Sequence, residues 1–117
     1  MWIITPVGFF SIVQKPDDIR QHTLTVRARD QADLDALRKY YLPSLGEISA
    51  GAGTDYRFRA KALRSEVAAA MSALVEDIEY DNFKSEVRRR QGPLREAIYY
   101  LVWEALQEIQ ERRQLVE

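Results

Sequence analysis

The chain has 117 residues, of which 46% are hydrophobic and 30% are charged, a balance typical of a folded globular protein and not of a disordered segment. This length suffices for one well-buried core, so we expect a single domain over residues 1–117, strand-rich over 1–63 and helical over 64–117. Seventeen basic and 18 acidic residues give a formal net charge of −1, which excludes a strong overall attraction to nucleic acid or to anionic lipid.

The composition also narrows the chemistry and the compartment. The chain has no cysteine, which excludes disulfides, thiolate metal sites and cysteine nucleophiles. Its apolar runs are shorter than the roughly 20 residues that a membrane-spanning helix needs, and residues 1–6 lack the features of a signal peptide. We therefore expect a cytoplasmic protein that does not associate with membranes.

A hairpin is predicted at the start of the chain. Strand-forming residues at 2–5 and 9–14 flank Pro6 and Gly8, and a proline and a glycine this close together favour a tight turn. Residues 15–18 are typical of a polar loop.

Two later segments have the alternating pattern of a strand with one buried face. Residues 23–29 and 56–62 both place apolar side chains at every second position. The apolar positions are Leu24, Val26 and Ala28 in the first segment and Tyr56, Phe58, Ala60 and Ala62 in the second. A short edge strand around residues 47–49 is a further candidate.

Helices are predicted after two of these strands. Asp30 is a suitable N-cap for a helix over residues 31–41, which Pro43 ends. Ser65 is a suitable N-cap for a second helix, whose apolar residues recur at three-and-four spacing until it ends near Tyr80.

Two more helices are predicted in the C-terminal part. Asp81 or Asn82 caps a short helix that Gly92 interrupts, and Pro93 occupies the first turn of the last helix. The last helix carries an apolar arc wider than contact with one sheet needs. This arc consists of Leu94, Ile98, Leu101, Val102, Ala105 and Ile109, with Tyr99, Trp103 and Leu106 beside them.

This order of elements predicts an α+β fold with two layers, an antiparallel sheet and the helices that cover it. Further helices are expected at the C-terminus. Residues 23–80 read as strand, helix, strand, strand and helix, and the strand near Phe9 can supply the remaining strand of a permuted ferredoxin-like sandwich. A three- or four-stranded meander is an open alternative.

Several stretches form a pattern that extends over nearly the whole chain. They are Met1-Trp2-Ile3, Gly8 to Lys15, Leu24 to Arg29, Gly53 to Lys61, Tyr80 to Lys84 and Val102-Trp103-Glu104. In this pattern the chain resembles a family of short, widely distributed bacterial proteins of unknown function. The resemblance implies no activity, cofactor or catalytic residue.

The first candidate binding surface is a basic strand face, formed by the polar positions of the two alternating strands. Its members are Arg27, Arg29, Arg57, Arg59 and Lys61. If the two strands are neighbours, these side chains form a positive stripe that suits phosphates or an acidic partner. The plainer interpretation is the solvated side of a sheet that is covered on one face only.

Two further candidates lie in the helical part. Asn82 and Lys84 are candidate contacts for an anionic group near a helix N-terminus, although a solvated helix end next to Arg88 to Arg90 explains them as well. The second candidate consists of Tyr99, Trp103 and Leu106, which form either a helix-packing surface or a homodimer interface.

Signals for catalysis are missing. His22 is the only histidine, and neither a nucleophile motif, a metal-ligand pattern nor a phosphate-binding loop accompanies it. We therefore expect no catalytic residue, metal site or cofactor.

The leading hypothesis is a small non-enzymatic protein-interaction module that forms a homodimer. The alternative is a nucleic-acid-binding protein that uses the basic strand face.

Overall fold

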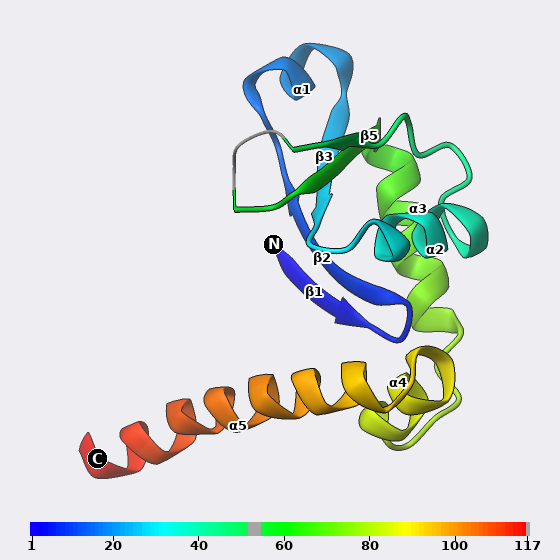
Figure 1. The fold of residues 1–117 in the computed structure, drawn as a ribbon. Coiled ribbons are helices and arrows are strands. Elements are labelled where there is room, and N and C mark those ends of the chain that lie inside the picture. Colours follow the sequence, from blue (N-terminus) through cyan, green and yellow to red (C-terminus); the bar gives the residue numbers. More distant parts are fainter. Residues whose placement is uncertain (52–54, 117) are drawn as a thin grey trace. The chain divides into compact units, whose positions relative to one another are not determined.

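The structure is a computed structural model that describes residues 1–51 and 55–116. It divides the chain into two compact units, Met1–Glu79 and Tyr80–Glu117. The described part of the first unit contains one sheet and three helices, and that of the second contains two helices (Figure 1). A single domain over residues 1–117 stays a prediction.

Five antiparallel strands form one sheet in the order β1-β2-β3-β5-β4. The strands are β1 (Trp2–Thr5), β2 (Gly8–Val13), β3 (Thr23–Ala28), β4 (Ser49–Ala50) and β5 (Phe58–Leu63), and the helices of this unit are α1 (Pro16–Gln21), α2 (Gln31–Tyr40) and α3 (Arg64–Glu76). The predicted α+β class is confirmed. Strands β2, β3, β5 and β4 with helices α2 and α3 follow the order expected for the permuted ferredoxin-like sandwich, and β1 extends the sheet at one edge.

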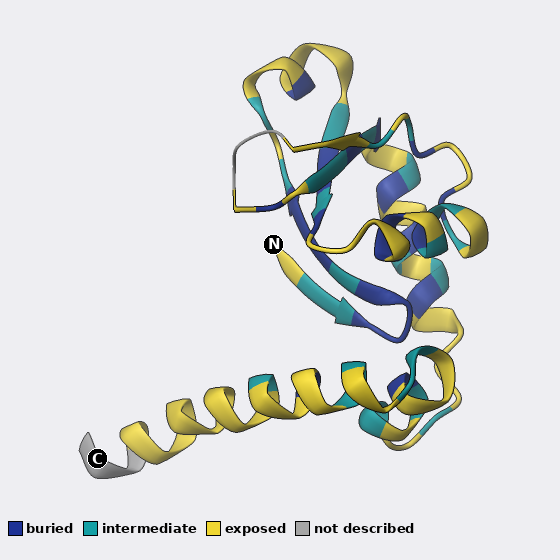
Figure 2. Cartoon of the chain, in the orientation of Figure 1, coloured by how far each residue is buried: buried dark blue, intermediate teal, exposed yellow. Residues whose placement is uncertain are grey.

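The core lies between the sheet and helices α2 and α3, as the alternating patterns predicted. Val26 of β3 lies opposite Ala60 of β5, and Leu24 lies opposite Ala62. The helices contribute buried side chains to the same cluster, namely Leu34, Leu37, Val67, Ala70 and Leu74. Figure 2 shows buried positions concentrated where the strands and these helices face each other.

The predicted hairpin of β1 and β2 is confirmed, and a threonine hydroxyl organises its turn. The Thr5 Oγ1 donates to the Gly8 carbonyl at 2.9 Å and accepts from the amides of Val7 and Gly8. Asp33, in the first turn of α2, lies against this turn and accepts from the Phe9 amide at 3.0 Å. Helix α2 is thereby fixed to the hairpin by a buried carboxylate as well as by apolar contacts.

The prediction of a polar loop at residues 15–18 is wrong, because α1 begins there. Pro16 occupies the first position of this helix, where a missing amide costs nothing. The Asp18 carboxylate accepts from the Lys15 amide at 2.8 Å and so caps the helix N-terminus. The helix ends at Gln21, and the C-cap residue His22 adopts the left-handed conformation with φ of 57°.

Replacing His22 by Gly is expected to raise the free energy of unfolding by about 0.5–1 kcal/mol, because glycine adopts the left-handed region without the steric cost of a Cβ. The His22 side chain is exposed, so little packing is lost. Urea unfolding measures the change. His22→Ala is the control, since it also removes the imidazole but keeps the Cβ, and it should give no gain. Equal gains from both variants would contradict this explanation.

Other differences from the sequence predictions lie at element ends. Helix α3 begins at Arg64 directly after β5, with Leu63 at the N-cap position, so Ser65 lies inside the first turn and is not the cap. The helix ends at Glu76, short of the predicted Tyr80. The expected edge strand near residues 47–49 lies at Ser49–Ala50.

The second unit consists of α4 (Phe83–Gln91) and α5 (Pro93–Val116). Both predicted helices are confirmed, and the Asn82 side chain caps α4 by accepting from the Ser85 amide at 2.9 Å. Val87 is fully buried, and Phe83 stacks on Tyr99 with ring centroids 6.1 Å apart. Among the described residues, no helix combines the length and the apolar character that crossing a membrane requires.

Candidate functional site

The sheet face opposite α2 and α3, here called the open face, carries most of the predicted basic residues. Pairing places Ser11 opposite Trp2 and Arg27 opposite Ser11. The same row continues from Arg27 to Arg59 on β5, and Ser49 lies beyond Arg59 at the sheet edge. The two arginine-bearing strands are therefore neighbours, which was the condition for a positive stripe, and two arginines lie directly across from each other.

Arg27 and Arg29 both stack on Tyr56. Each guanidinium carbon lies 4.6 Å from the Tyr56 ring centroid, and the ring is buried. Arg27 also donates to the Ser11 Oγ at 2.7 Å, and Arg29 donates to the Asp55 carbonyl at 2.9 Å. The Arg27 Nε is buried without a hydrogen-bond partner in the described part of the chain.

Tyr56 corrects the sequence analysis in one respect. It was expected on the apolar side of a strand with Phe58, but it precedes β5 and its ring packs on residues of the open face. Phe9 contacts this ring, with centroids 6.3 Å apart, and Trp2 contacts Phe9 edge-on at 6.1 Å. Trp2 is 75% exposed. A row of three aromatic rings thus adjoins the arginines. The sequence analysis did not predict this row.

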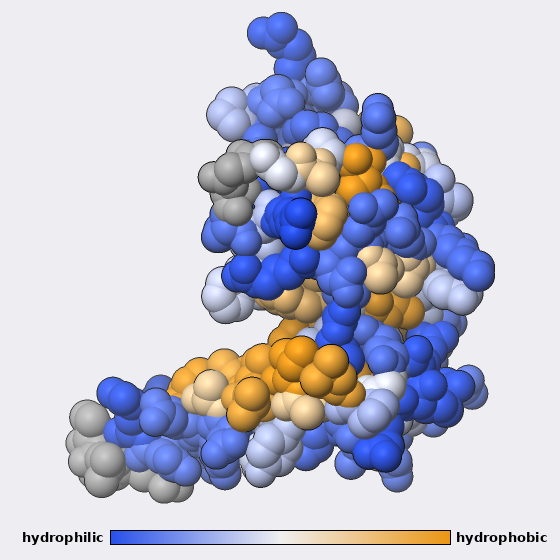
Figure 3. Space-filling view, viewed as in Figure 1, coloured by the Kyte–Doolittle hydropathy of each residue, from blue (hydrophilic) through white to orange (hydrophobic). Residues whose placement is uncertain are grey.

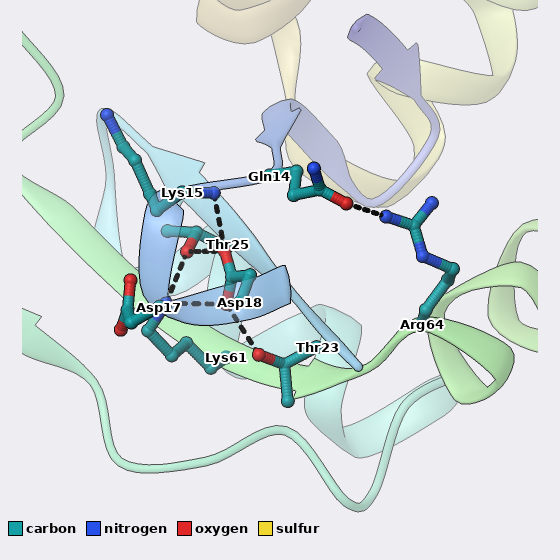
Figure 4. Close-up of polar contacts among 8 residues, drawn as sticks. All are labelled: Gln14, Lys15, Asp17, Asp18, Thr23, Thr25, Lys61 and Arg64. Atoms are coloured by element: carbon teal, nitrogen blue, oxygen red, sulfur yellow. Dashed lines mark hydrogen bonds and ion pairs between the residues drawn. The ribbon is translucent and has the colours of Figure 1, made fainter. Parts of the chain in front are cut away.

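Lys61 differs from the arginines because it belongs to a closed polar cluster around Asp18 (Figure 4). Its Nζ lies 2.6 Å from the Asp18 carboxylate and 3.2 Å from that of Asp17. The buried Asp18 carboxylate also accepts from the hydroxyls of Thr23 at 2.5 Å and Thr25 at 2.8 Å. Lys61 therefore holds α1 against β3 and β5.

The ionisation of this cluster follows from its contacts. Burial alone would raise the pKa of Asp18, but the hydrogen bonds from Lys61, the two threonines and the Lys15 amide outweigh burial and hold that pKa well below its usual range. Burial likewise acts to lower the pKa of Lys61, and its bonds to Asp18 and Asp17 outweigh that effect and raise the pKa. Both groups stay charged at neutral pH.

A cavity of about 290 Å³ lies beside Arg59 and Lys61 near the β4 edge of the sheet. Its other lining residues are Thr25, Gly46, Glu47, Ser49 and Ala60. One carboxylate, two hydroxyls and two cations belong to its lining residues, although most of the lining surface is apolar. Arg57, just before β5, is exposed, and its guanidinium carbon lies 5.7 Å from the Phe58 ring.

In the second unit, the predicted anion contacts have local roles. Asn82 is the α4 cap, and the Lys84 ammonium lies 4.9 Å from the Trp103 ring and 5.1 Å from the Tyr100 ring. Lys84 and Tyr100 also line a groove of about 550 Å³, together with Glu96, Ala97 and Leu101.

The three consecutive arginines of α4 pair with carboxylates of the same unit. Arg89 donates through two nitrogens to Glu86, Arg90 lies 3.8 Å from the same carboxylate, and Arg88 pairs with Glu96 at 3.2 Å. Hydrogen bonding from Arg89 lowers the pKa of Glu86. This arginine run is thus largely neutralised. In the part of the chain that the structure describes, no group of His, Asp and Glu side chains could hold a metal ion.

The three predicted interface residues have different environments. Tyr99 is buried and accepts from the Arg95 guanidinium at 3.1 Å, whereas Trp103 and Leu106 are 50% and 57% exposed. Beside them, large apolar side chains continue along α5 and remain exposed. They are Leu94, Ile98, Leu101 and Ile109. Figure 3 shows this apolar surface as a continuous patch along the helix.

Comparisons with known proteins found no matching protein-family model, no matching curated protein and no matching solved structure. The resemblance to a family of short bacterial proteins therefore stays a prediction.

Proposed function

We propose that this protein is a non-enzymatic interaction module that forms a homodimer through α5. The observation that carries the proposal is the exposed apolar face of that helix, here called the α5 stripe. It consists of Leu94, Ile98, Leu101, Ala105 and Ile109, which share one face at three-and-four spacing. Leu94, Leu101 and Ile109 are 76%, 63% and 67% exposed. Exposed apolar surface of this extent favours a partner.

The spacing of the α5 stripe favours a second copy of the same chain as that partner. A two-fold axis between Leu101 and Val102 would bring the two copies of Leu101 side by side and pair the other stripe residues with those of the antiparallel copy. Leu94 would meet Ile109, and the larger Ile98 would meet the smaller Ala105. Such self-complementarity is what a two-fold interface requires, because the same patch serves both subunits. Large residues facing small ones also pack without voids.

The size of the surface fits a dimer of moderate strength. Large side chains that are about half exposed offer roughly 100 Å² each. With Leu106 beside it, the α5 stripe supplies on the order of 500 Å² per copy, while a standard interface buries about 800 Å² per partner. Val102, which flanks the α5 stripe beside Leu101, adds to this area.

The dimer is tested by light scattering behind size exclusion at high micromolar concentration. We expect a mass near twice the 13.6 kDa of the chain. Leu101→Lys should weaken the dimer at least tenfold, because it places a charge at the centre of the interface. Gln107→Lys is the matched control, since it adds the same charge at an exposed position on the opposite side of α5. A monomeric wild type, or equal effects of both variants, would overturn the proposal.

The geometry of the dimer has its own test, because the chain contains no cysteine. Leu101→Cys lies next to the proposed axis and should form an interchain disulfide under mild oxidation, since such bonds need Cα atoms about 4.4–6.8 Å apart. Leu94→Cys should not cross-link to itself in an antiparallel pair, but it should cross-link to Ile109→Cys on the other chain. Efficient self-cross-linking at residue 94 would indicate a parallel pair and contradict the proposed axis.

A further inference from the structure

We infer that the open face of the sheet binds single-stranded nucleic acid, with bases stacked on the exposed Trp2 at the end of the aromatic row and phosphates held by the arginines. This site lies in the first unit and uses none of the residues of the α5 stripe. It leaves Lys61 out of the basic strand face, because Asp18 and Asp17 hold the Lys61 ammonium.

The arrangement of the arginines favours an anionic ligand. Arg27 and Arg59 lie directly opposite each other on neighbouring strands, a position in which like charges destabilise a sheet. In the described residues, no carboxylate forms an ion pair with Arg27, Arg29 or Arg57, whereas Lys61, Arg88 and Arg89 all have such partners. A phosphate would give Arg27, Arg29 and Arg57 an anionic partner.

The aromatic row favours a ligand with flat rings. Trp2, Phe9 and Tyr56 contact one another in sequence, and the outermost ring, Trp2, is 75% exposed. Bases of a single strand stack on such rings, and each stacked base contributes appreciably to affinity without regard to its identity. Arg27 and Arg29 are already held against Tyr56, so their planar groups lose little freedom when they bind.

The dimensions fit a short single strand better than a duplex. The row from Trp2 to Arg59 crosses four neighbouring strands, which at about 4.8 Å per strand spans roughly 14 Å. Sheets that bind RNA stack about two or three bases over a comparable surface. In a duplex the bases are already stacked on each other, so they are not available to stack on an aromatic side chain of the sheet. The formal net charge of −1 means that binding depends on this local surface.

Binding is measured by fluorescence anisotropy with a labelled 12-nucleotide oligothymidine at several salt concentrations. Trp2→Ala should weaken binding about tenfold. Arg27→Gln and Arg29→Gln should each weaken binding. Each should also lower the slope of log affinity against log salt concentration by about 0.7, the value for one phosphate of a single strand. Lys39→Ala is the matched control, because it removes one exposed charge from α2 on the other side of the sheet, and it should have little effect.

Three results would overturn the inference. They are no measurable binding at low salt, equal affinity for the duplex of the same sequence, and equal binding of polyglutamate, which carries charge without rings. Thermal unfolding shows whether the arginine variants remain folded, and the exposed Trp2 gives a test that does not depend on them. Leu101→Lys should keep its affinity for oligothymidine, so failure of the dimer and failure of this site are distinguishable.

Discussion

Asp18→Asn is expected to lower the free energy of unfolding by about 3 kcal/mol at neutral pH, because breaking a buried ion pair leaves uncompensated polar groups. The amide keeps the size of the carboxylate but cannot accept bonds from Lys61, both threonine hydroxyls and the Lys15 amide together. Helix α1 should then detach from the sheet. Urea unfolding followed by circular dichroism measures the loss.

Asp17→Asn is the matched control for this prediction. Asp17 pairs with the same Lys61 ammonium at 3.2 Å, but its side chain is 61% exposed, whereas that of Asp18 is 0% exposed. An exposed pair contributes less than about 1 kcal/mol. Equal losses from the two variants would mean that charge alone, and not the buried hydrogen bonds, stabilises the cluster.

The same cluster predicts a pH dependence. The pKa of Asp18 is lower in the folded chain than its ordinary value of 3.8. The ionised carboxylate therefore contributes its full share of the free energy of unfolding above about pH 4–5, and this contribution is lost as the pH falls further. The pKa of Lys61 is raised above 10.5, so its contribution is present at neutral pH and is lost only when the pH rises beyond that value. Between pH 5 and pH 2, Asp18→Asn should therefore show a weaker loss of stability than the wild type.

Gly8→Ala is expected to lower the free energy of unfolding by about 3 kcal/mol, which is at the upper end of the range for overpacked cores. A Cβ at residue 8 would lie 2.6 Å from both the Cβ and the Cγ of Asp33. To remove this overlap, the hairpin and α2 must move apart, which also stretches the bond between Asp33 and the Phe9 amide. Chemical unfolding measures the cost.

Gly46→Ala is the comparison for this variant, because the same methyl group there would meet a single backbone oxygen, that of Lys61, at 3.1 Å. We expect a smaller cost at residue 46, since one neighbour must shift by only a few tenths of an ångström. A Gly8→Ala protein as stable as the wild type would show that the turn and α2 can separate without loss.

The parts of the fold that were predicted correctly depend on local signals. Alternation identified β3 and β5 and the apolar face of each, because side chains of a strand point to opposite sides in turn. Asn82 and Pro93 identified two helix starts, because capping and a fixed φ act within one helical turn. These elements left a permuted ferredoxin-like order and a meander open, and the observed order agrees with the permuted one.

The parts that were missed depend on distant residues. Helix α1 has six residues and little apolar periodicity, and its Asp18 finds its cation 43 residues later in the chain. The pattern of proline followed two positions later by aspartate was a usable signal for this helix. The place of Tyr56 beneath two arginines has no such signal, since it depends on how the chain enters β5. For the same reason, the sequence could not separate Lys61 from its neighbouring arginines.

The late synthesis of β5, which pairs with the central strand β3, has a consequence for the growing chain. Strand β3 has β2 on one side, but its other partner is synthesised only about 30 residues after it. A ribosome adds roughly 5–20 residues per second, so for a few seconds the growing chain presents β3 with one unpaired edge and an uncovered apolar face. Such an edge is a template for pairing with other chains. A chain that stops before residue 58 should therefore aggregate and require chaperones, whereas one that includes β5 and α3 can complete its core.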